Sequence, residues 1–76
     1  MGTIVLIVWH DAHSVASTWI DVGDIDSEPA VVESVGFLLA DAKPKHIVLA
    51  QSLTDNDGDH ILAVPVEMVR SMKVLL

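Results

Sequence analysis

A chain of 76 residues is long enough for one small domain, residues 1–76, and its lack of cysteine excludes disulfide bonds and thiolate zinc sites. Hydrophobic residues make up 51% of the chain and the mean hydropathy is +0.52, which is high for a domain with so much surface per unit volume. We therefore expect a homo-oligomer that buries apolar surface between chains. The formal net charge of −7 disfavours duplex nucleic acid as a partner, because binding phosphates needs clustered lysine and arginine.

A contact with a membrane is not expected either. The longest apolar run, residues 4–9, is far shorter than the ~20 residues of a membrane-spanning helix. The N-terminus also lacks the basic flank and the small-residue cleavage site of a signal peptide. We therefore expect a cytoplasmic protein.

The first part of the sequence predicts a strand followed by polar segments. Residues 3–9 are rich in isoleucine and valine, which favours a strand that is apolar on both faces. Residues 10–18 are small and polar and predict a loop or bend. Residues 19–22 read as a short extended piece, and residues 23–29 read as an acidic turn.

The longest predicted strand spans residues 30–41. Gly36 lies in its middle and shares a face with Ser34. Because glycine has no side chain to pack in a strand, Gly36 predicts a bulge or a strong bend. A turn at residues 41–44 follows, and residues 46–51 predict the next strand.

The C-terminal part predicts a hairpin, a short turn and a last strand. Residues 54–59 carry the clearest hairpin signal, because Asp-Gly supplies residues that tolerate positive φ. Residues 60–64 predict a strand that Pro65 ends. Residues 66–69 predict a short 3₁₀ or helical turn, and residues 71–76 predict a final short strand.

This order of elements predicts an all-β protein, a small five-stranded SH3-like or Sm-like barrel with a short 3₁₀ or helical turn before the last strand. The alternative is an α+β protein with a C-terminal helix. Apolar positions between residues 64 and 76 partly fit a helical spacing, and Pro65 suits a first helical turn.

Both tryptophans and two of the four histidines gather near the N-terminus. The segment Trp9-His10-Asp11-Ala12-His13-Ser14 begins at the end of the first predicted strand, and Trp19 follows it. The pattern W-x-D-A-x-S with a second tryptophan resembles a family of small proteins encoded by tailed phages and prophages. The resemblance continues through Glu33-Ser34-Val35-Gly36-Phe37 and the Val64-Pro65 step, so that it covers most of the chain. It implies a phage origin.

The tryptophans are the strongest candidates for a binding site, since an indole face can stack on a purine and its N–H can orient a ligand. Trp9 and Trp19 on either side of a polar loop, with Asp11 and Ser14 available for ribose or base edges, suit a nucleotide pocket. Trp9 also has a structural interpretation as a core residue that ends a buried strand. The predicted ligand-binding residues are Trp9, Asp11, His13, Ser14, Trp19 and Glu33.

Neither catalysis nor a bound metal or cofactor is expected. The two imidazoles of residues 10–13, with Asp11, could bind a metal together with His46 or His60, but hydrogen bonds to solvent or backbone explain them more simply. Ser14 lacks a Gly-x-Ser-x-Gly elbow, and the four glycines are too scattered for a phosphate loop. We expect a non-enzymatic protein.

Small acidic phage domains without catalytic motifs usually act by binding. Our hypothesis is therefore a phage protein that counters antiviral defence in the cytoplasm of an infected bacterium. Its partners would be copies of itself and a small nucleotide-type immune signal, held at subunit boundaries. One alternative is an acidic inhibitor of a host defence protein, favoured by the charge of −7. Another is an Sm-like RNA-binding ring, against which the shortage of lysine and arginine counts.

Overall fold

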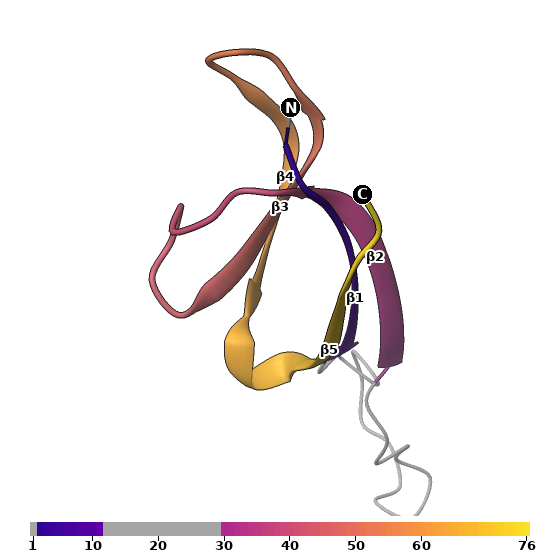
Figure 1. Cartoon of the computed structure of the whole chain (residues 1–76). Coiled ribbons are helices and arrows are strands. Elements are labelled where there is room, and N and C mark those ends of the chain that lie inside the picture. The colour runs from indigo at the N-terminus through magenta and orange to yellow at the C-terminus, as the bar shows by residue number, and fades with distance from the viewer. Residues whose placement is uncertain (1, 12–29) are drawn as a thin grey trace, which may run out of the picture.

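Five antiparallel strands form one bent sheet in the computed structural model, which describes residues 2–11 and 30–76 (Figure 1). The strands are β1 (Ile4–Asp11), β2 (Ala30–Leu38), β3 (His46–Leu53), β4 (Gly58–Pro65) and β5 (Val69–Val74), and the 3₁₀ turn η2 (Val66–Met68) precedes β5. Their order across the sheet is β4-β3-β2-β1-β5. The predicted all-β class is confirmed, and so is the short turn before the last strand.

The alternative with a C-terminal helix is wrong, because the segment after Pro65 forms η2 and β5. Pairing of β5 with β1 stabilises the extended conformation there and overrides the partly helical spacing. Strands β4 and β5 lie at the two edges of the sheet, and no pairing between them is found among the described residues. Closure into an SH3-like or Sm-like barrel therefore stays a prediction.

Strand β1 lies between β2 and β5 and supplies the centre of the core. It pairs with β2 along its whole length, from Ile4↔Phe37 to Asp11↔Ala30. The prediction of a loop is therefore wrong for residues 10 and 11, because cross-strand pairing extends β1 through them. Alternate side chains of β1 point to the inside of the bend, where Val5 and Ile7 are fully buried.

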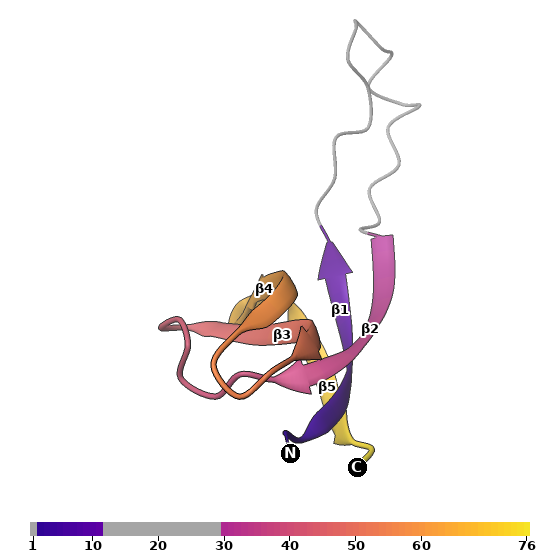
Figure 2. The same cartoon turned by 90° about the horizontal axis from the view of Figure 1, so that it is seen from above.

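Strand β2 gains a second partner just after Gly36. It follows β1 throughout but pairs with β3 only at Phe37↔Ala50 and Leu38↔Leu49, and in Figure 2 it curves away from the direction of β1 towards β3. A Cβ atom on Gly36 would lie 2.9 Å from the carbonyl oxygen of Ala50. Gly36 therefore lies at a crowded position, close to the backbone of β3. It lets the backbone of β2 approach β3 where the sheet bends.

The core is small and lies on the concave side of the sheet. Its buried cluster consists of Val5, Ile7, Leu49 and Val64. The partly buried residues packed against this cluster are Trp9, Leu38, Ile47, Leu62, Met68 and Val69. Strands β1, β3 and β4 supply the buried cluster, and Leu38 of β2 and Val69 of β5 pack against it, so the core depends on the bend that folds β3 and β4 over β1.

The predicted hairpin at residues 54–59 is confirmed, but its turn chemistry differs from the prediction. The amide of Thr54 donates to the carbonyl oxygen of Asp57 at 2.8 Å, and the amide of Asp57 donates to the Thr54 hydroxyl at 3.0 Å. These bonds close a longer turn, so Gly58 does not take the positive φ that the Asp-Gly pair predicted. Among the described residues, positive φ occurs at Asp41, Lys45 and His60.

The described residues include no helix that is long and apolar enough to cross a membrane.

Candidate functional site

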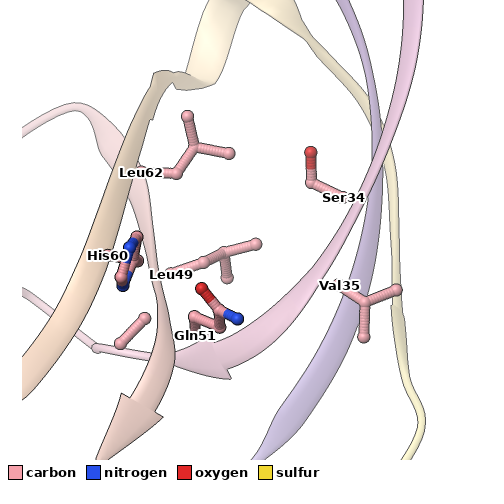
Figure 3. A pocket seen from close by; sticks show the side chains of 7 residues that line it. Ser34, Val35, Leu49, Gln51, His60 and Leu62 are labelled. Carbon is pink, nitrogen blue, oxygen red and sulfur yellow. The ribbon is translucent and has the colours of Figure 1, made fainter.

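A cavity of about 290 Å³ opens on the concave side of the sheet, between the middle of β2 and the β3–β4 hairpin. It is lined by Ser34, Val35, Leu49, Ala50, Gln51, His60 and Leu62. Figure 3 shows the Ser34 side chain pointing across this space towards Leu62, whereas the Val35 side chain points away from it. The cavity exists because β2 pairs with β3 only on the C-terminal side of Gly36. On the N-terminal side of Gly36 the two strands are separated, and the space between them is open.

The hydroxyl of Ser34 is held in place by Trp9. The indole Nε1 of Trp9 donates a hydrogen bond to Ser34 Oγ at 3.1 Å. Because an indole N–H can only donate, the Ser34 oxygen is the acceptor, and its own hydrogen remains available for another acceptor. The bond connects the end of β1 with the wall of the cavity, and it turns the Ser34 hydroxyl into an oriented donor.

His60 has an unusual backbone for a strand residue. Its φ is 51°, in the left-handed region, and the β3–β4 ladder passes from Ala50↔Ile61 to Ser52↔Asp59 without a regular pair between Gln51 and His60. Such a conformation costs about 1–3 kcal/mol in a non-glycine residue and persists only where the surroundings hold it. The interruption of the ladder falls at two of the residues that line the cavity.

The carboxylate of Asp59 contacts both the backbone amide and the imidazole ring of His60. The carboxylate accepts from the His60 amide at 2.9 Å and lies 2.9 Å from the ring Nδ1. The side chains are 73% and 72% exposed, so this contact orients the ring more than it stabilises the fold. When Nδ1 carries the proton that faces the carboxylate, Nε2 of a neutral ring is left as an acceptor.

The predicted site residues do not all lie on one face. Trp9 is on the concave face, packed against the core, and Asp11 is two residues further along β1, opposite Ala30. Glu33 pairs with Val8 and is exposed on the convex face, on the opposite side of the sheet from Trp9. The structure thus separates Glu33 from Trp9. The predicted residues His13, Ser14 and Trp19 lie outside the described residues.

Arg70 is a neighbour of the N-terminal motif that the sequence did not reveal. The β1–β5 register shifts between Val8 and Trp9, which leaves Arg70 as an extra residue on β5. Its guanidinium Nε donates to Nδ1 of His10 at 3.3 Å. Within residues 2–11 and 30–76, no three histidine or carboxylate side chains lie close enough to hold a metal ion.

Gln51, His60 and Leu62 are cavity residues that sequence reasoning missed. One local feature of the sequence could have indicated the cavity. Ser34 in β2 and Gln51 in β3 are polar residues at inward-facing positions of strands whose other inward positions are apolar. No protein-family model matches the chain, and no match was found among curated proteins or solved structures.

Proposed function

We propose that the chain is a phage-encoded, non-enzymatic binding protein that acts as a homo-oligomer and sequesters a small nucleotide-type signal of host antiviral defence. The observation that supports this proposal is the concave cavity. Its lining combines apolar leucine side chains with the hydroxyl of Ser34, the amide of Gln51 and the imidazole of His60. Small-molecule sites have this composition, with mostly apolar linings and a few polar groups that fix orientation.

The lining has the chemistry to bind a base and its sugar. Leu49 and Leu62 offer apolar contact to the face of a ring, and the Gln51 amide can donate to and accept from a base edge. The Ser34 hydroxyl, oriented by Trp9, can donate to a further acceptor. A volume of about 290 Å³ lies at the lower end of ligand pockets, so a larger ligand would need a second chain to enclose it.

Replacing Gln51 by alanine is expected to weaken nucleotide binding about tenfold to a hundredfold, because a hydrogen-bonded edge loses its partner. The measurement is calorimetric titration with a panel of mononucleotides and cyclic dinucleotides. Native mass spectrometry of the protein from infected cells identifies the bound species. The matched control is Ser52→Ala, because Ser52 is the adjacent exposed residue and does not line the cavity. Equal weakening by both variants, or no low-mass ligand in either measurement, would contradict the proposal.

A second candidate is an acidic inhibitor that covers a basic surface of a host defence protein. It is favoured by the end of the β3–β4 hairpin, where Asp55, Asp57 and Asp59 are all exposed. Clustered charge of one sign accelerates association with a surface of opposite sign. This function predicts that a host protein co-purifies and is lost when Asp55 and Asp57 are replaced by asparagine, while Gln51→Ala has no effect.

A further inference from the structure

The convex face of β1 and β2 presents uncovered apolar side chains. Val5 and Ile7 are fully buried on the concave side, so Leu6 and Val8 point to the convex side. Val35 is paired with Leu6, and Val31 lies on the same face of β2, four residues before Val35. Val31 is 65% exposed and Val35 is 59% exposed. We call the surface formed by Leu6, Val8, Val31 and Val35 the convex apolar face.

Two opposite charges lie on either side of this face. Glu33 of β2 pairs with Val8, and Lys73 of β5 pairs with Leu6, so the two residues stand on opposite sides of β1. Ideal sheet spacings place their backbones roughly 12 Å apart, with apolar side chains between them. Asp59 and His60 form the only ion pair found within residues 2–11 and 30–76. Neither Glu33 nor Lys73 therefore has an ionic partner in this part of the chain.

We propose that the convex apolar face is an interface with a second copy of this chain, related by a two-fold axis that runs parallel to β1. Such an axis superposes β2 of one copy on β5 of the other. Glu33 then lies over the partner's β5, two residues along that strand from the partner's Lys73, and Lys73 stands in the same relation to the partner's Glu33. Because both side chains are long and point into the interface, they can meet across this offset. The two contacts are equivalent, as an isologous interface requires.

Charge explains why a second copy fits this surface. The chain has a net charge of −7, so copies repel each other over most of the surface. The convex apolar face lies between Glu33 and Lys73, whose charges cancel, and in a two-fold partner each of them faces the strand that carries its opposite. Apolar contact between two aligned sheets then removes the exposed valines from water. The inference rests on the homo-oligomer of the proposed function and names its contact surface.

A charge-reversal cycle tests the interface. Glu33→Lys and Lys73→Glu are each expected to weaken the dimer at least about tenfold, because each places like charges opposite one another twice per dimer. The double variant is expected to restore dimerisation, since the pairs re-form with reversed sign. Sedimentation velocity measures the association, and circular dichroism verifies that the exposed substitutions leave the fold intact. A double variant as weak as the single variants would overturn the interface.

A matched pair of valine substitutions provides the control. Val31→Glu is expected to give a monomer, whereas Val66→Glu, which makes the same change at a 48% exposed valine of η2, is expected to leave the dimer intact. Equal effects of the two substitutions, or a wild-type protein that sediments as a monomer at micromolar concentration, would overturn the proposal. A dimer that follows this pattern but binds no nucleotide supports the interface and contradicts only the nucleotide function.

Discussion

Replacing Gly36 by valine is expected to lower the free energy of unfolding by about 3 kcal/mol. A Cβ atom at this position would lie 2.9 Å from the carbonyl oxygen of Ala50 and 3.2 Å from the Cβ atom of Leu49. The first of these neighbours is backbone and the second is fixed to it, so neither can move without shifting β3. The bend that folds β3 and β4 over β1 is therefore under strain in the variant.

Chemical denaturation measures this loss, and Gly58→Ala is the matched control. A Cβ atom on Gly58 would meet the side-chain end of Ile61 at 3.1 Å, which can rotate away, and Gly58 has no positive φ to lose. This variant is expected to change stability by less than about 1 kcal/mol, with reduced freedom of the unfolded chain offsetting the contact. A larger loss of stability in Gly58→Ala than in Gly36→Val would contradict the conclusion that the core depends on the bend at Gly36.

The strands could be predicted because local pattern and tertiary pairing agree for most of the chain. The valine-rich start of β1, the glycine in β2 and the polar segment before Gly58 each correspond to the observed elements. The end of β1 could not be predicted, because His10 and Asp11 are extended through pairing with β2, which a local pattern does not contain. The same reason explains why residues 69–74 form a strand.

The candidate site was harder to predict than the fold. Trp9 was recognised from composition, but its partner Ser34 lies 25 residues away and is brought to it only by the β1–β2 register. That register also places Glu33 on the convex face. His60 joins the cavity through a left-handed backbone conformation held by Asp59, which no hydrophobic period reveals. The convex apolar face likewise depends on which residues pair across β1.

Trp9 joins the core to the cavity, so its substitutions are expected to separate the two roles. Trp9→Ala is expected to cost about 3–5 kcal/mol, because it removes a large side chain packed against the buried cluster. In a domain of this size such a loss leaves little folded protein. Trp9→Phe keeps most of the apolar contact and removes only the N–H that holds Ser34, so the protein is expected to remain folded with a modestly lower melting temperature.

In the folded Trp9→Phe variant, the affinity for the nucleotide shows whether the hydrogen bond between Trp9 and Ser34 contributes to ligand binding. If the bond orients the Ser34 hydroxyl, Ser34→Ala weakens nucleotide binding about tenfold, and Trp9→Phe weakens it by a similar factor. The double variant is then no worse than Ser34→Ala alone, because the two residues act through the same hydroxyl. Titration of the three variants with the nucleotide identified for the wild-type protein gives this comparison, and melting curves on the same samples report stability separately. A Trp9→Phe protein with a lower melting temperature and unchanged affinity would assign Trp9 to the core alone, since its N–H would then have no effect on the ligand.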